Sequence, residues 1–435
     1  MTAPSFRHDR AGTPAAAWTE RIAALPVLQL PAARVLVVVG AHPDDETLGA
    51  GGLLRAAGLA GWRTEVVTAT AGEGSHPHSP THGRDRLADV RRRELEHAVA
   101  VLDPRATTTC LDLPDGDVAS HVEDVVARLT ELIGTDGADV LLCAPYRHDG
   151  HPDHEAVSRA AAVAGARTDA QLLEYPVWLW HWGQDDDLPA DRASRLVLDA
   201  DAREAKRQAV HAHASQVAPL SDRPGDEVLL DVGLLAHFDR AAEVFVDPEP
   251  VDDDALDRVH RERPDPWQVD SFYERRKRAV TLAALPREHY GRALEVGCSI
   301  GALAVDLADR TEHLLALDSS RTALDLARQR LDGVPGVDVR HARVPDEWPE
   351  GRFDLVSVSE VGYFLSPQAL RELVRRCIGS LTDDGHLLLC HWRHQPAGWP
   401  LAGPAVHEEF LATGAEVLVE HHEADFLLHV LGRPA

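Results

Sequence analysis

Cysteine is scarce in this chain of 435 residues, and its pattern is irregular. The five cysteines are an odd number, have no Cys-x-x-Cys spacing and lie mostly in apolar sequence. A disulfide framework or a zinc site made of thiolates needs paired or closely spaced cysteines. The sequence therefore indicates neither.

Positive charge is also in short supply. The chain has 44 Lys and Arg residues against 71 Asp and Glu, so its formal net charge is -27 at pH 7. Such a charge repels phosphate backbones and anionic membrane surfaces. We expect no nucleic-acid partner, unless a local basic patch outweighs the average.

A third absence is a long apolar run. The N-terminal stretch MTAPSFRHDRAGTPAAAW has no apolar signal core, and no segment approaches the roughly 20 apolar residues that cross a bilayer. We expect a cytoplasmic protein without a membrane span.

What the chain does have is the composition of a globular protein, with 44% hydrophobic and 26% charged residues. Its length favours two or three domains. Two similar strand-to-helix openings appear, ARVLVVVGAHPDDE and GRALEVGCSIGA, and between them residues 246–267 are rich in proline and acid. We predict one domain over residues 1–245, a linker over 246–267 and a second domain over 268–435.

Both predicted domains alternate strands with helices. Residues 33–40 are rich in valine and leucine, as expected of a buried parallel strand, and helix-like and strand-like segments follow in turn up to DVLLCAPY. The second half repeats this alternation from RALEVGC to GHLLLCHW. The sequence therefore predicts an α/β protein with two Rossmann-like, doubly wound domains joined by an acidic, proline-rich linker.

Two adjacent carboxylates, Asp44 and Asp45, follow the first predicted strand. Neighbouring side chains on a strand point to opposite faces, but Pro43 ends the extended run, so both aspartates lie on a turn where they can serve one site. A second strand, DVLLCAPY, ends in RHDGHPDHEA, which places His151 and His154 in the same kind of position. Reactive groups gather at such strand ends in open α/β sheets.

These residues have the chemistry of a hydrolytic zinc site. Such a site needs a few imidazoles and carboxylates and one position left for water, and His42, Asp45 and His154 could supply three ligands. Asp44 is then free to take a proton from the attacking water, and His151 to polarise a carbonyl or protonate a leaving nitrogen. The alternative is that these are loop acids and capping groups. The joint occurrence of both motifs, each at the end of its own strand, favours a metal site.

The motifs AHPDDE and GHPDH closely resemble the PIG-L/LmbE family of metal-dependent de-N-acetylases, over about residues 30–245. The resemblance implies the same three ligands for zinc, with Asp44 as general base and His151 as electrophilic helper, acting on an N-acetyl group attached to a sugar. Four further polar residues are weaker candidates, and a solvated surface accounts for the two arginines more simply. They are Arg84, Arg86, His211 and His213.

The second domain opens with a different pattern. In ALEVGCSIGALAVDLAD, Gly297 and Gly301 mark a tight strand-to-helix turn where the backbone can approach a ligand closely. The next strand, HLLALD, ends in Asp318, an acid placed to accept hydrogen bonds from ribose hydroxyls. The G-x-G-x-x-G spacing that cradles a pyrophosphate is missing, so a cofactor without pyrophosphate fits better.

This pattern resembles a class I S-adenosylmethionine methyltransferase, with Ser299 at the usual middle glycine. Over about residues 264–433 the sequence is similar to nodulation protein S and its relatives, which N-methylate the free amine of a deacetylated amino-sugar oligomer. We expect S-adenosylmethionine to be bound by four residues: Glu295, Gly297, Gly301 and Asp318.

The candidates for contact with the methyl acceptor are less specific. Glu360, after the fourth strand of this domain, and His391, after the fifth, lie where an acceptor amine could be oriented or deprotonated. An equally simple alternative is that His391, Trp392 and His394 form a packed aromatic edge. Two residues in the helix before the first strand could close over the cofactor: Tyr273 and Arg278.

Together the two halves predict a bifunctional enzyme that uses zinc to remove the N-acetyl group of an amino sugar and S-adenosylmethionine to N-methylate the freed amine. The partner is a small molecule, whether a free sugar, a glycoside or a nucleotide-linked sugar, and self-association into a homo-oligomer stays open. The alternatives are that the halves act on different substrates, that the second is an O-methyltransferase, or that it only senses S-adenosylmethionine.

Overall fold

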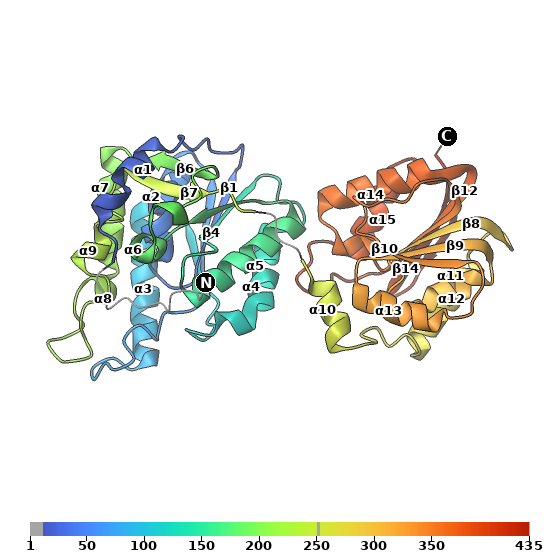
Figure 1. The fold of residues 1–435 in the computed structure, drawn as a ribbon, viewed down its shortest axis with the longest axis horizontal. Coiled ribbons are helices and arrows are strands. Elements are labelled where there is room, and N and C mark those ends of the chain that lie inside the picture. The colour runs from blue at the N-terminus through green and yellow to red at the C-terminus, as the bar shows by residue number, and fades with distance from the viewer. Residues whose placement is uncertain (1–11, 250–252, 435) are drawn as a thin grey trace. The chain divides into compact units, whose positions relative to one another are not determined.

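Two compact units make up the structure, a computed structural model that describes residues 12–249 and 253–434 (Figure 1). The units are Met1–Val251 and Asp252–Ala435. The division falls inside the stretch 246–267, for which the sequence predicts a linker. Residues 1–11 of the N-terminal stretch considered above, and residues 250–252 of the predicted linker, lie outside the described residues.

The first unit is built on a sheet of seven strands. Their order is β3 (Thr107–Cys110), β2 (Arg63–Thr68), β1 (Val35–Gly40), β4 (Val140–Pro145), β5 (Gln171–Tyr175), β7 (Ala242–Val246) and β6 (Ala193–Val197). β1 is parallel to both of its neighbours and is buried from Leu36 onward, as an apolar central strand requires. β7 runs antiparallel to β5 and β6.

Helices cover both faces of this sheet (Figure 1). Leu36 and Val38 of β1 pack into one apolar cluster with α2 (Asp45–Leu59), α3 (Arg84–Leu102) and α7 (Ala200–Ala212). Val37 and Val39 pack into another cluster with α4 (Val122–Ile133) and α5 (Pro152–Thr168). Successive residues of a strand face opposite sides, so β1 contributes to two cores. Shorter helical segments complete the unit: η1 (Ala15–Trp18), α1 (Thr19–Ala24), η2 (Val118–His121), α6 (Leu179–Trp182), η3 (Asp185–Asp187), α8 (Ala214–Val217) and α9 (Val232–Leu235).

The second unit repeats this strand order. Its sheet runs β10 (Val337–His341), β9 (Thr311–Asp318), β8 (Tyr290–Val296), β11 (Phe353–Ser359), β12 (Leu381–Trp392), β14 (Phe426–Gly432) and β13 (Val417–His422). β14 is the antiparallel strand, paired with β12 and β13. One apolar cluster includes α14 (Pro367–Ser380) and α15 (Gly403–Leu411). The cluster on the opposite face includes α12 (Ala302–Ala308) and α13 (Arg321–Arg330), with α11 (Phe272–Ala283) packed against it, and η4 (Gly362–Phe364) follows β11.

The fold class predicted from the sequence is confirmed, because both units are α/β and have helices on both faces of a largely parallel sheet. The antiparallel strands β7 and β14 were not part of that prediction. Part of the predicted linker is ordered, since residues Ala255–Glu262 form helix α10. The cysteines are all free thiols, and none of the described helices is long and apolar enough to cross a membrane.

Candidate functional site

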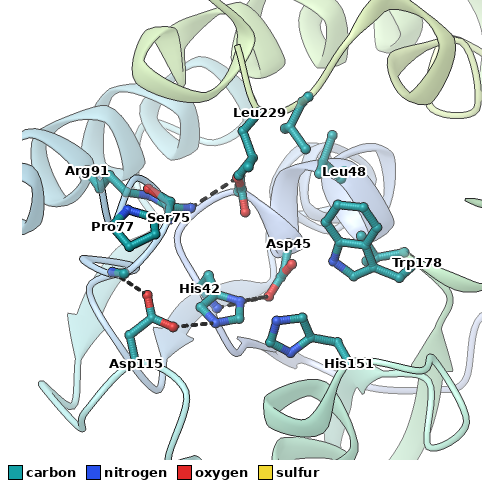
Figure 2. Close-up of a pocket in the computed structure, with 14 residues that line it drawn as sticks. His42, Asp45, Leu48, Ser75, Pro77, Arg91, Asp115, His151, Trp178 and Leu229 are labelled. Atoms are coloured by element: carbon teal, nitrogen blue, oxygen red, sulfur yellow. Dashed lines mark hydrogen bonds and ion pairs between the residues drawn. The ribbon is translucent and has the colours of Figure 1, made fainter. Parts of the chain in front are cut away.

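The first site lies where β1 and β4 end and where α2 and α5 begin. His42 follows β1, and Asp45 is the first residue of α2. His151 caps the N-terminus of α5, and His154 lies in its first turn. Figure 2 shows His42, Asp45 and His151 directed toward the same space. The structure therefore brings together the residues of the two sequence motifs.

Three of these side chains converge on one point. His154 Nε2 lies 3.2 Å from Asp45 Oδ1, and His42 Nδ1 lies 3.6 Å from Asp45 Oδ2. Zinc bonds of about 2.0–2.1 Å in a tetrahedral site separate ligand atoms by about 3.3–3.4 Å. The spacing of the three side chains thus matches that of zinc ligands.

The other ring nitrogens of both histidines meet carboxylates. His154 Nδ1 lies 2.8 Å from Asp149 Oδ2. His42 Nε2 lies 3.2 Å from Asp115 Oδ1 and 3.3 Å from Asp153 Oδ2. Carboxylates in these positions hold the ring protons away from the point of convergence, an arrangement common behind metal-binding histidines. The sequence analysis identified none of these three supporting aspartates.

Two observations test whether a cation suits this cluster. His154 Nε2 is buried and has no hydrogen-bond partner among the described residues, although Asp45 lies near it. Burial lowers the pKa of the His154 imidazole, but Asp45 and Asp149 outweigh that effect and raise the pKa to about 9. The cluster thus has an excess of negative charge that a divalent cation would neutralise.

Asp44 has a separate environment. Its carboxylate is buried and accepts a hydrogen bond from Arg91 of α3, at 3.1 Å. Burial raises the pKa of Asp44 to about 6, and the Arg91 charge opposes that rise. Arg91 is 2% exposed and also donates to the Gly72 and Pro43 carbonyls, so it fixes the loop as well as the acid. The sequence analysis did not identify Arg91, since nothing in its helical pattern marks it as buried.

His151 is kept neutral. Burial, together with the nearby His154 and His42 rings, lowers the pKa of His151 to about 2. The Asp153 N–H donates to His151 Nδ1 at 3.2 Å, so the neutral ring carries its proton on Nε2. His151 can therefore donate a hydrogen bond but is a poor base.

A pocket of about 220 Å³ opens over these residues (Figure 2). Its wall combines the charged cluster with apolar side chains that include Trp178, Leu48 and Leu229. The weaker sequence candidates do not line it: Arg84 and Arg86 are exposed, His211 is exposed, and His213 is buried against Thr47 and Glu46.

The second site surrounds the turn between β8 and α12. Gly297 has a φ of 76°, and a Cβ on it would lie 1.9 Å from the Val361 side chain, so glycine is required there. Gly301 has a φ of 78° and caps α12. Ser299 takes a left-handed φ of 48°, so the serine that replaces the usual glycine keeps the turn at some cost in strain.

Two acids flank this turn. Asp318, at the end of β9, accepts the Ser299 and Ser320 N–H groups, each at 2.8 Å. Glu295, at the end of β8, is buried, and its Oε2 has no hydrogen-bond partner among the described residues. Burial and the Asp318 charge raise the pKa of Glu295 to about 8. An unpartnered buried acid at this turn fits a ligand that carries positive charge and hydrogen-bond donors, as S-adenosylmethionine does.

Glu360 lies in a polar cluster after β11. Its Oε1 accepts from Lys277 Nζ at 2.7 Å, and its Oε2 accepts from the Trp392 N–H at 3.0 Å and from the Tyr363 hydroxyl. Lys277 in turn lies 5.1 Å from the centre of the Tyr273 ring. These contacts, to which the Lys277 charge contributes, hold the pKa of Glu360 below its usual value despite burial.

His391 lies behind this cluster. It is fully buried, its Nε2 accepts the Gly362 N–H at 3.2 Å, and its Nδ1 lies 3.0 Å from His407 Nε2. Both ring nitrogens are thus engaged by the protein. Trp392 and His394 are exposed with ring centroids 4.8 Å apart, and Arg278 is paired with Asp306.

Comparison with known proteins identifies both units. The family model described as GlcNAc-PI de-N-acetylase matches residues 37–164, and a methyltransferase-domain model matches residues 293–385. A 1D-myo-inositol 2-acetamido-2-deoxy-alpha-D-glucopyranoside deacetylase from Actinosynnema mirum is 27% identical over 238 residues, which are 44% of this chain and 83% of that protein.

Nodulation protein S from Sinorhizobium fredii is 31% identical over 135 residues, 30% of this chain and 62% of that protein. The chain covers 53% of the length of the same protein from Rhizobium tropici. A crystal structure of the N-methyltransferase NodS from Bradyrhizobium japonicum with S-adenosyl-l-homocysteine is 25% identical and has a TM-score of 0.39, covering 42% of this chain and 100% of that one. The chain thus carries a PIG-L/LmbE-type domain in its first unit and a class I methyltransferase domain similar to nodulation protein S in its second.

Proposed function

We propose that the chain is a bifunctional enzyme that removes the N-acetyl group of an amino sugar and then N-methylates the freed amine. The observation that carries this proposal is the presence, on one chain, of a convergent His42, Asp45 and His154 cluster and a domain similar to nodulation protein S. The amino-sugar substrate follows from the names of the relatives, one of which is a deacetylase of a 2-acetamido-2-deoxy-glucopyranoside. We assign deacetylation to residues 1–245 and methylation to residues 268–435, with α10 added to the methylating unit.

Zinc is the cofactor that we propose for the first site. His42, Asp45 and His154 offer two imidazoles and one carboxylate, a donor set that zinc prefers. When bound, the ion polarises the amide carbonyl and makes water a better nucleophile. The carboxylates behind both imidazoles favour this role, because each accepts a hydrogen bond from the protonated ring nitrogen that faces away from the ion and so orients the other nitrogen toward it.

Asp44 and His151 have complementary tasks in this proposal. Asp44 accepts the proton of the attacking water, while Arg91 holds its carboxylate in place. His151 donates its Nε2–H to the oxygen on which negative charge develops. Proton transfer to the departing nitrogen then completes hydrolysis and leaves a primary amine and acetate.

The second site provides the methyl group. Glu295, Gly297, Gly301 and Asp318 bind S-adenosylmethionine, with Asp318 accepting hydrogen bonds from the ribose. Glu360 orients the acceptor amine and takes the proton that the nitrogen loses on methylation. We place His391 behind the Glu360 loop, holding the Gly362 N–H, because both of its nitrogens are engaged away from any acceptor.

The decisive test is mass spectrometry of a panel of N-acetyl amino sugars, free, glycosidic and nucleotide-linked. Each is incubated with the full chain, zinc and S-adenosylmethionine. We expect one class to exchange acetyl for hydrogen and then to gain a methyl group on nitrogen. Exchange without methylation of the same molecule, or methylation on oxygen, would contradict the joint function.

The remaining alternative is that the second unit only senses S-adenosylmethionine. Calorimetric titration with this cofactor, together with a turnover assay, distinguishes the two. An enzyme binds the cofactor and consumes it in the presence of the deacetylated sugar. A sensing module binds it without turnover on any member of the panel.

A further inference from the structure

A second cluster of potential metal ligands lies at the outer edge of the methyltransferase sheet. β13 is the edge strand and pairs with β14, so that Glu420 lies directly opposite His429. His422 is two residues from Glu420 and therefore projects from the same face of the strand. Glu420 and His422 are exposed, and His429 is buried.

The three side chains converge closely. Glu420 Oε1 lies 3.2 Å from His422 Nε2 and 3.9 Å from His429 Nε2. The deacetylase cluster has the same donor set, two imidazoles and one carboxylate, with corresponding separations of 3.2 and 3.6 Å. Three of these four separations lie within about 0.3 Å of the value of about 3.3–3.4 Å that tetrahedral zinc imposes on its ligand atoms, and the separation between Glu420 and His429 is the widest at 3.9 Å.

Buried histidines support the inner ligand. His429 Nδ1 lies 2.7 Å from His407 Nδ1, and His407 Nε2 lies 3.0 Å from His391 Nδ1. His429 therefore has one nitrogen held by the protein interior and the other directed toward Glu420 and His422. A hydrogen bond donated by the second ring nitrogen is how proteins fix the orientation of a metal-binding imidazole.

We propose that Glu420, His422 and His429 form a second site for a divalent transition-metal ion such as zinc, separate from the deacetylase site. A paired antiparallel strand is a rigid support for such a site. The exposure of two ligands leaves the remaining coordination positions to water. The site is thus suited to an ion that exchanges with solvent.

His391, His407 and His429 form a row of three hydrogen-bonded rings. Binding of an ion at this site changes which nitrogen of each ring carries the proton. Without an ion, the Gly362 N–H donates to His391 Nε2, so each neutral ring in turn carries its proton on the side facing His429. An ion on His429 Nε2 requires the proton of that ring on Nδ1. The rings of His407 and His391 must then reverse as well, and the Gly362 N–H loses its acceptor.

The test counts metal ions per chain. The metal-stripped full chain is dialysed against micromolar zinc and then against cobalt, and bound metal is measured by elemental analysis. In an Asp45→Ala/His154→Ala background, which removes the first cluster, we expect one ion to remain. Adding Glu420→Gln or His422→Ala should lower the affinity for that ion at least about tenfold, since even supporting residues are worth that much.

His421→Ala is the matched control. His421 lies between the two exposed ligands but projects from the opposite face of β13, where it meets Glu423 at 2.7 Å. This variant should keep the affinity of its parent. Equal binding by the His422→Ala and His421→Ala variants would overturn the proposal, as would the absence of any ion from the Asp45→Ala/His154→Ala background.

The protonation of the His391 ring nitrogens gives a second test of the proposal. Nitrogen NMR of histidine-labelled chain distinguishes a protonated ring nitrogen from an unprotonated one. We expect zinc to convert His391 Nε2 from the unprotonated to the protonated form. An unchanged His391 ring in the zinc-loaded chain would remove His429 from the ligand set and overturn the proposal.

Discussion

Asp44 and Asp45 are adjacent in the sequence, yet the backbone gives them different surroundings. Asp44 has a φ of 128° and meets Arg91, whereas Asp45 begins α2 and faces His154. A non-glycine residue with such a φ is strained, and strain of this kind gathers at functional sites. The sequence predicts that both acids belong to one site, but the buried arginine that separates their tasks comes from a distant helix.

We expect Asp44→Asn to keep its metal and to lose most deacetylation. Asn has nearly the same shape but cannot take a proton from water, and such assistance contributes about a hundredfold or more. Asp45→Ala should instead lose the ion of the deacetylase site, because it removes a ligand, and keep only the ion proposed for Glu420, His422 and His429. Elemental analysis and an acetate-release assay measure the two effects, and equal metal loss in both variants would refute this division of tasks.

Glu295 makes stability depend on pH. Its pKa is raised from 4.5 to about 8 in the folded chain, so the folded state holds this proton more tightly than the unfolded state does. Its contribution to stability is therefore complete below pH 4.5 and is lost as the pH rises toward 8 and beyond.

Without cofactor, the wild-type methyltransferase unit should thus lose more stability between pH 6 and pH 8 than Glu295→Gln does, by about 1–2 kcal/mol. Thermal unfolding at both pH values measures this difference. Glu350→Gln, at an exposed position, is the control and should behave as wild type does. Parallel pH profiles for Glu295→Gln and wild type would mean that Glu295 is not protonated in the free protein.

Among the helices and strands, the hydrophobic pattern predicted the bounds best for segments with a regular series of buried residues. The segment VEDVVARLTELI is α4 over its full length, and FDLVSVS is β11. The antiparallel β7 and β14 escaped prediction, because strand direction depends on pairing with distant residues rather than on local pattern. Helix α10 was missed because its acidic, proline-flanked sequence resembles a linker.

Contacts of α10 show why that segment folds. Asp257 accepts hydrogen bonds from the Ser320 hydroxyl at 2.8 Å and from the Thr322 N–H at 3.0 Å. It thereby satisfies a backbone donor in the first turn of α13, which starts beside Asp318. Part of the predicted linker thus contributes to the edge of the proposed cofactor site.

Asp257→Ala should destabilise the methyltransferase unit by about 1 kcal/mol, as the loss of a helix-capping acid does. Chemical denaturation of the full chain measures the change. Asp254→Ala removes an exposed acid of the same segment that pairs only with Arg258 and Arg261 among the described residues, and its effect should be much smaller. Equal effects of the two substitutions would contradict the capping role.

At the scale of the whole molecule, the two units have the same strand order but different kinds of residues at their sites. One site gathers carboxylates and imidazoles around a point suited to a cation, and the other leaves a buried acid beside a glycine turn. The common fold therefore does not determine either reaction, since function depends on the residues placed at the strand ends. Those residues were predictable from short motifs, whereas the groups that support them were not.

If both units serve one sugar, the order of the two reactions is set by the nitrogen. An acetamide nitrogen delocalises its lone pair into the carbonyl, so it is a poor methyl acceptor, and deacetylation must come first. Wild-type chain given acetylated sugar and S-adenosylmethionine should yield an N-methyl amine, and Asp44→Asn should yield almost none. The same variant given deacetylated sugar should methylate it at the wild-type rate, because its second unit is intact. Methylation of the acetylated sugar by Asp44→Asn would point to a hydroxyl acceptor. If this variant methylates neither sugar but still binds the cofactor, the two units serve unrelated molecules.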